Sequence, residues 1–220
     1  MTQPWQKQHL QCMARLLFIT LATIAVSKGT LTSFANSPVL AQVHDYRVKQ
    51  NSSAATLNLK EGQVILNGSK GQYTGYVIAK GDLPVIWKVL TDYDNFEKYM
   101  PNVVESKLLE NRGNYKVFEQ VQVFQLLTFS RKAKVKIVVN EDYPKQIKFK
   151  VVEGEVKSLQ GSWQIDSMGS NKYLITHQVS VEPDIQSSFN RGLFFTVYED
   201  SVEKTLGVVS QESARLSGTR

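Results

Sequence analysis

Residues 81–103, GDLPVIWKVLTDYDNFEKYMPNV, contain the clearest local signals for the fold. Asp82 is a favoured helix N-cap residue, and the apolar residues after it recur at helical spacing, which predicts a helix over residues 84–91. A second short helix is predicted over residues 94–99, because Pro101 cannot continue it. These two short helices separate one extended segment before them from a longer extended region after them.

Extended segments dominate the chain on both sides of this stretch. The predicted strands span residues 72–79, 103–109, 115–124, 128–139, 146–152, 158–165 and 172–181. Short turn sequences rich in Gly, Asn and Pro join the last six strands, which indicates an antiparallel meander. Residues 187–216 contain no Pro and carry apolar residues at helical spacing, so they are predicted to form a long amphipathic helix. The expected fold is α+β, a curved seven-stranded antiparallel sheet around this C-terminal helix, with a cavity between them.

Alternation of side chains along four strands assigns them to the two faces of the sheet. One face is apolar and aromatic, and we expect it to line the cavity. Its candidate ligand-contacting residues are Phe129, Arg131, Val135, Phe149, Val151, Trp163, Ile175 and His177.

The opposite face carries five lysines on two adjacent strands, Lys132, Lys134, Lys136, Lys148 and Lys150. They either meet anionic lipid headgroups, as a peripheral membrane contact, or form the solvated convex face of a sheet whose other side is buried. Nucleic acid is not expected as a partner, because no aromatic residues interleave with these lysines.

Two ionisable residues fall on the expected inner face. His177, between Ile175 and Val179, is a general base, a hydrogen-bond donor to a ligand carbonyl, or a core residue whose hydrogen bonds are satisfied. Arg131 begins an otherwise apolar row, so it either lines the cavity mouth or extends to water.

Two further polar candidates depend on orientations that the sequence leaves open. In the strand over residues 115–124, either the set with Val117 and Glu119 or the set with Phe118 and Gln120 points inward. Tyr198 on the C-terminal helix either brings a phenol into the cavity or packs in the core.

The composition argues against several function classes. The chain has 220 residues, a formal charge of +6 and one cysteine, so an intrachain disulfide and a cysteine-ligated zinc cluster are excluded. No histidine and carboxylate cluster at ligand spacing appears, and neither does a nucleophile elbow, a Walker loop or a dinucleotide-binding glycine motif. No metal and no cofactor are therefore expected, and binding is the default function.

The N-terminal region has the order of a secretory signal. Residues 1–41 contain three basic and no acidic residues, and an apolar run over residues 16–26 is too short to span a membrane. Small residues ending at Ala41 provide a cleavage site before Gln42. We expect cleaved export to a periplasm, a lumen or the exterior, with an uncleaved membrane anchor as the alternative. A polar lead-in over residues 42–70, with room for one hairpin, follows.

Three motifs resemble one protein family. The stretch over residues 83–103, LQGSW at 159–163 and GLF at 192–194 are similar to the polyketide cyclase/dehydrase and coenzyme Q-binding branch of the START-like (SRPBCC) superfamily. The resemblance covers residues 72–216 and implies a helix-grip domain over residues 71–218. It also implies a hydrophobic ligand between the sheet and the helix.

The leading hypothesis is non-catalytic binding, sequestration or transport of a hydrophobic small molecule such as a lipid, an isoprenoid quinone, a pigment or a polyketide-like compound. The C-terminal helix would add Phe194, Val197 and Tyr198 to the ligand contacts. The alternative is a polyketide-type cyclase or dehydratase in which His177, with Glu119 or Tyr198, acts as acid and base.

Overall fold

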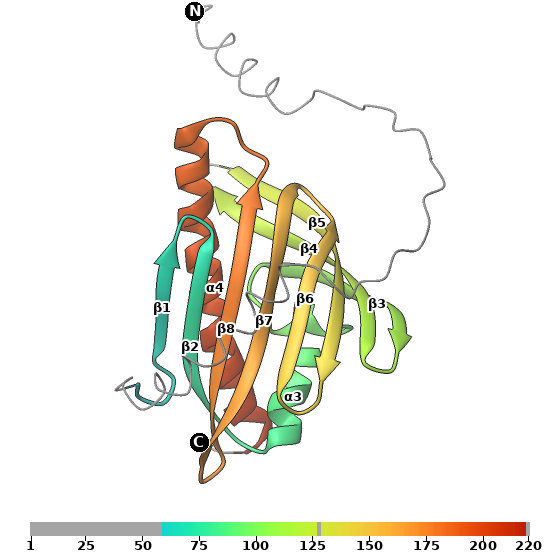
Figure 1. The fold of residues 1–220 in the computed structure, drawn as a ribbon, viewed down its shortest axis with the longest axis vertical. Coiled ribbons are helices and arrows are strands. Elements are labelled where there is room, and N and C mark those ends of the chain that lie inside the picture. The colour runs from blue at the N-terminus through green and yellow to red at the C-terminus, as the bar shows by residue number, and fades with distance from the viewer. Residues whose placement is uncertain (1–58, 127–128, 219–220) are drawn as a thin grey trace, which may run out of the picture. The chain divides into compact units, whose positions relative to one another are not determined.

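The computed structural model describes residues 59–126 and 129–218 (Figure 1). The predicted export segment and most of the predicted lead-in therefore lie outside the described residues. The strands are β1 Val64–Ser69, β2 Gln72–Lys80, β3 Val103–Arg112, β4 Tyr115–Leu126, β5 Phe129–Asp142, β6 Gln146–Glu153, β7 Val156–Gly169 and β8 Lys172–Pro183. The helices are α3 Leu83–Thr91, the 3₁₀ helix η1 Phe96–Lys98 and α4 Ser188–Leu216. The predicted order of strand, two short helices, strands and long helix is confirmed.

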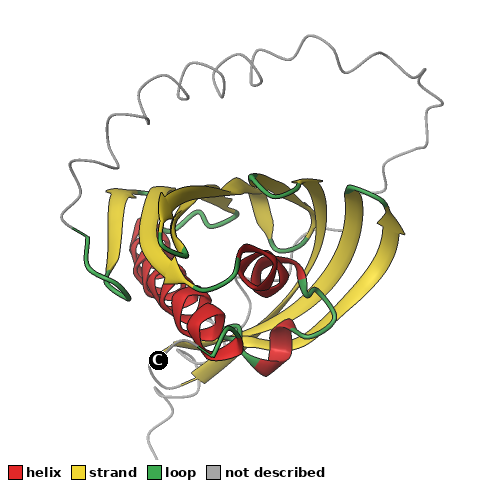
Figure 2. Ribbon diagram, turned by 90° about the horizontal axis from the view of Figure 1, so that it is seen from below, coloured by secondary structure: helices red, strands yellow, loops and turns green. Residues whose placement is uncertain are grey.

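All strands belong to one antiparallel sheet with the order β1-β2-β8-β7-β6-β5-β4-β3. The six strands after η1 follow one another as a meander, and β8 then returns to pair with β2. Figure 2 shows the sheet as an arc whose concave side encloses the helices. The predicted α+β architecture, a curved sheet around a long C-terminal helix, is confirmed.

The strand count is eight, whereas seven were predicted. The additional strand, β1, lies within the segment expected to be a polar lead-in, and it pairs with β2 in the register Val64↔Val77 to Ser69↔Gln72. Gly71, with a φ of 90°, occupies the tight turn between them, a conformation that glycine adopts without steric cost. The short, partly polar β1 is an edge strand, which explains its weak sequence signal.

Both predicted helix starts are present. Asp82 occupies the N-cap of α3, although its side chain makes no capping hydrogen bond there. Ser187 caps α4, and its hydroxyl accepts a hydrogen bond from the backbone N–H of Asn190 at 3.4 Å. Of the helices in residues 59–126 and 129–218, none is long and apolar enough to span a bilayer.

Helix α4 packs most closely on β2. Leu206 and Val209 of α4 are completely buried there. A Cβ at Gly75 would lie 2.3 Å from a methyl carbon of Leu206, so this glycine lets the helix approach the strand. The Ser210 hydroxyl also donates to the Ile78 carbonyl at 2.8 Å. This anchor fixes the C-terminal half of α4 and leaves its N-terminal half beside the remaining concave face.

Candidate functional site

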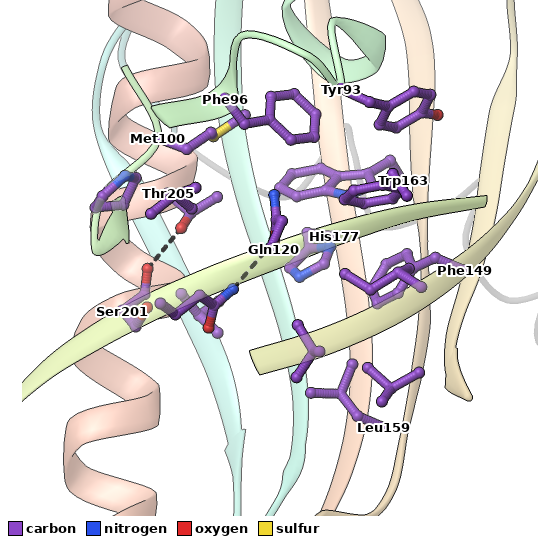
Figure 3. Close-up of a pocket in the computed structure, with 18 of the residues that line it drawn as sticks. Tyr93, Phe96, Met100, Gln120, Phe149, Leu159, Trp163, His177, Ser201 and Thr205 are labelled. Atoms are coloured by element: carbon purple, nitrogen blue, oxygen red, sulfur yellow. Dashed lines mark hydrogen bonds between the residues drawn. The ribbon is translucent and has the colours of Figure 1, made fainter. Parts of the chain in front are cut away.

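A cavity of about 200 Å³ lies on the concave side of the sheet (Figure 3). Strands β3 to β8 supply one wall, and α4 and the segment from α3 to β3 supply the other. Most of the lining is aliphatic or aromatic. The polar members are Tyr93, Gln120, Gln122, His177, Tyr198, Ser201 and Thr205. Among the described residues that line this cavity, none is Asp, Glu, Lys or Arg.

Three rings from adjacent strands form an aromatic wall. Trp163 of β7 and His177 of β8 are direct cross-strand partners, and their rings stack with centroids 3.8 Å apart. The ring of Phe149 on β6 lies parallel to the imidazole at 5.7 Å. A Cβ at Gly161 would come within 2.6 Å of the Phe149 ring and 2.2 Å of the Gln178 carbonyl oxygen. Glycine at 161 therefore permits the Phe149 ring to lie over β7.

His177 is neutral in this wall. Its Nδ1 lies 3.2 Å from the Ser162 carbonyl oxygen. A carbonyl only accepts, so Nδ1 carries the proton and Nε2 keeps its lone pair. Burial lowers the pKa of His177 to about 3, and the hydrogen bond to Ser162 only partly opposes that shift. Within the described part of the chain, no hydrogen bond reaches Nε2.

The structure resolves the orientation of β4. Gln120 and Gln122 face the cavity, and the Gln122 amide donates to the Gln120 side-chain oxygen at 3.2 Å. Glu119 points to the outer face, where it lies 2.8 Å from the Lys134 ammonium group. This position corrects the alternative in which Glu119 served as an acid or base in the cavity. The reason is the register of β4 with β5, which pairs Gln120 with the inward-facing Val135.

Helix α4 contributes Tyr198 to the cavity lining, which is one of the two positions that the sequence left open. The Tyr198 ring stacks on Phe194 at 5.8 Å and lies 6.0 Å from Tyr73. Burial raises the pKa of the Tyr198 phenol, so it stays protonated. Phe194 and Val197 do not line the cavity. Phe194 packs against the edge of the core instead.

The other predicted contact residues divide into two groups. Val135 and Val151 line the cavity together with the three rings of the aromatic wall. Ile175 shares their face, but it is completely buried in the core beyond the cavity. Arg131 lies near the start of β5, where it forms an ion pair with the exposed Glu155 and does not line the cavity. The backbone of Phe129 begins β5, and its side chain lies outside the described part of the structure.

Sequence reasoning missed the wall between α3 and β3. Tyr93, Phe96 and Met100 line the cavity from this connection. The Tyr93 ring stacks on Phe118 at 4.6 Å, and its hydroxyl donates to Glu141 at 2.8 Å. The concentration of aromatic and apolar residues in this connection was the sequence signal that could have predicted its place in the cavity wall.

The same connection is tied to α4. The Asn102 amide donates to the Ser201 hydroxyl at 3.2 Å, and the Thr205 hydroxyl donates to the Ser201 carbonyl at 2.8 Å. These hydrogen bonds place neutral hydroxyl groups on the helical side of the cavity.

The five predicted outer lysines lie on the convex face. Lys132, Lys148 and Lys150 are exposed. Lys134 pairs with Glu119, and Lys136 lies 2.5 Å from a Glu153 oxygen. Two of the five charges are therefore neutralised by neighbouring carboxylates. No group of three potential metal ligands occurs in the part of the chain that the structure describes.

Comparisons with known proteins agree with this architecture. Residues 82–196 match the family model described as polyketide cyclase/dehydrase and lipid transport. A comparison with curated protein sequences found no match.

Several solved structures share the fold. A protein of Thermus thermophilus aligns with a TM-score of 0.58 at 14% identity, over 66% of this chain and 97% of its own. The Zhui aromatase/cyclase of a Streptomyces species aligns with a TM-score of 0.56 at 13% identity, over 70% of this chain and 95% of its own. A STAR-related lipid transfer protein of Xanthomonas axonopodis aligns with a TM-score of 0.52 at 16% identity, over 68% of this chain and 92% of its own. At these identities the likeness concerns the fold.

Proposed function

Because this chain belongs to the polyketide cyclase/dehydrase and lipid transport family, we propose that it binds and carries a hydrophobic small molecule without converting it. The observation that carries the proposal is the cavity between the curved sheet and α4, which is lined mainly by apolar and aromatic side chains. Ligand pockets of this kind bury most of an apolar molecule and orient it through a few polar groups.

Burial of apolar surface provides the binding energy. Each 100 Å² of apolar ligand surface removed from water contributes about 2.5 kcal/mol before the ordering costs of association. Trp163, Phe149 and Phe96 offer flat surfaces for such a ligand, and Met100 offers a flexible one.

Co-purification and fluorescence test this proposal. Native mass spectrometry of the full-length protein, followed by organic extraction, should recover an apolar molecule bound in a defined ratio. A titration with the neutral probe N-phenylnaphthylamine should show saturable binding and a change in Trp163 fluorescence. If extraction recovers nothing apolar and the probe does not bind, the carrier function is refuted.

A second candidate is a cyclase or dehydratase, favoured by the family description and by the unpaired Nε2 of His177 inside the cavity. The pKa of His177, lowered to about 3, weakens this candidate, because an efficient general base has a pKa near the working pH. Glu119 also lies outside the cavity. His177→Asn would abolish turnover of a polyketide-like substrate if the residue were the base, and a carrier would show no turnover with either protein.

A further inference from the structure

The walls of the cavity discriminate against charge. The described residues that line it offer aliphatic and aromatic carbon, amides, hydroxyls and one neutral imidazole, and no side chain that could pair with an ion. A carboxylate or phosphate taken into such a site would lose its hydration without gaining an opposite charge. The lining therefore disfavours burial of a charged group.

The donor and acceptor roles of the two His177 ring nitrogens further restrict the chemical class of the ligand. The Nδ1 proton is already engaged by the Ser162 carbonyl, and the ring stacks on Trp163, with the Phe149 ring nearly parallel to it at 5.7 Å. The remaining ring atom, Nε2, is a hydrogen-bond acceptor. A ligand carbonyl is also an acceptor, so it cannot pair with Nε2 without a tautomer change that would leave the Ser162 carbonyl facing a second acceptor.

Another strand of the sheet wall, β4, has the same neutral character. Figure 3 shows Gln120 entering the same cavity from β4 while His177 enters from β8. Gln120 accepts a hydrogen bond from Gln122 through its side-chain oxygen, which leaves its own amide N–H groups to donate. Gln120 is buried, with 6% of its surface exposed, so a neutral ligand oxygen is a suitable acceptor for these groups.

We infer that the ligand is an uncharged apolar alcohol or phenol whose hydroxyl donates a hydrogen bond to Nε2 of His177. This inference rests on the proposed carrier function and narrows it. It excludes fatty acids and other molecules that must bury a charge. It also predicts that a hydroquinone or a long-chain alcohol binds more tightly than the corresponding quinone, ketone or ether.

Three ligands of equal chain length test the inference. Dodecanol, dodecyl methyl ether and dodecanoate are each titrated against the full-length protein loaded with N-phenylnaphthylamine at neutral pH. We expect the ether to bind about tenfold more weakly than the alcohol, because it lacks the donor. We expect dodecanoate to bind at least about tenfold more weakly than the alcohol, because its charge is desolvated without a partner.

Two variants test whether His177 is responsible for the preference for the alcohol over the ether. His177→Asn keeps an amide donor near the Ser162 carbonyl and removes the Nε2 acceptor, so the alcohol should fall to the affinity of the ether. Gln178→Ala, a change at the next position along β8 and on the opposite face, should leave the preference for the alcohol unchanged.

The outcomes separate the two proposals. If the ether or dodecanoate binds as tightly as dodecanol, the hydroxyl inference is overturned while the carrier function stands. If neither the probe nor dodecanol binds, the carrier function fails and the inference fails with it. An alcohol preference that survives in His177→Asn would also overturn the role of Nε2.

Discussion

The indole of Trp163 and the imidazole of His177 stack with ring centroids 3.8 Å apart and ring planes inclined by 20°. They are direct partners across β7 and β8, so the sheet register itself produces the contact. The stack covers one face of the imidazole, and Phe149 lies on the same aromatic wall. It explains why a histidine inside an apolar cavity is neutral and fixed in one orientation.

We expect Trp163→Phe to keep the fold and to remove the change in tryptophan fluorescence on ligand binding, because Trp163 lines the cavity. Trp87 is the matched control. It is buried in α3 against Tyr143 and does not line the cavity, so Trp87→Phe should preserve the response. Fluorescence titration of both variants with N-phenylnaphthylamine makes the comparison. A response that disappears in the Trp87 variant and persists in the Trp163 variant would contradict the assignment.

The buried imidazole predicts a specific dependence of stability on pH. Burial lowers the pKa of His177 to about 3 in the folded protein, from an ordinary value of 6.5. Between these values the unfolded chain binds a proton that the folded protein does not. The free energy of unfolding should therefore fall as the pH drops below the ordinary value, by up to ~1.4 kcal/mol per unit.

Urea unfolding at about pH 7 and about pH 5 measures this slope. The His177→Asn variant lacks the titrating group, so its slope over the same interval should be smaller than that of the natural protein. Equal slopes in the two proteins would show that His177 is not held neutral.

Gly161→Ala should destabilise the protein. The new methyl group would meet the Gln178 carbonyl oxygen and the Phe149 ring, so backbone and ring must both shift, at a cost of about 1–3 kcal/mol. Gly192→Ala is the matched control, because nothing lies within 4 Å of the added carbon on α4. There the exchange should stabilise the helix by about 0.5–1 kcal/mol. Urea denaturation of both variants tests the opposite signs.

Adjacent positions on β4 test which face meets the ligand. Gln120→Phe places a ring in the cavity and should weaken N-phenylnaphthylamine binding by about tenfold. Glu119→Phe places the same ring on the outer face and should leave binding unchanged. Circular dichroism confirms folding of both. Equal losses in the two variants would contradict the orientation of β4.

We propose that the chain is exported and cleaved before Gln42. The support is the basic start, the apolar run over residues 16–26 and the small residues ending at Ala41. N-terminal sequencing of the exported protein should begin at Gln42. Ile19→Arg interrupts the apolar run and should retain the protein with its full N-terminus. Recovery of uncleaved protein in the membrane fraction would favour the anchor instead.

The order of the elements and most of the residues on the inner face of the sheet could be predicted from local sequence patterns. Periodicity is local, so alternation placed Val135, Phe149, Trp163 and His177 on the cavity side without knowledge of their neighbours. The two short helices followed from the apolar spacing after Asp82 and from the stop at Pro101, and both lie where the stretch predicted them.

The orientation of β4, the choice of which inner-face residues reach the cavity, and the second wall of the cavity depend on contacts between distant segments. Alternation along β4 fits either face, and only the pairing of Gln120 with Val135 selects one. Arg131 is the cross-strand partner of Phe124, which lines the cavity, yet the guanidinium group of Arg131 forms an ion pair with Glu155 and does not line the cavity. The physical reason is that spacing along a chain fixes relative direction, whereas sheet curvature and strand register, which depend on distant segments, fix what each side chain contacts.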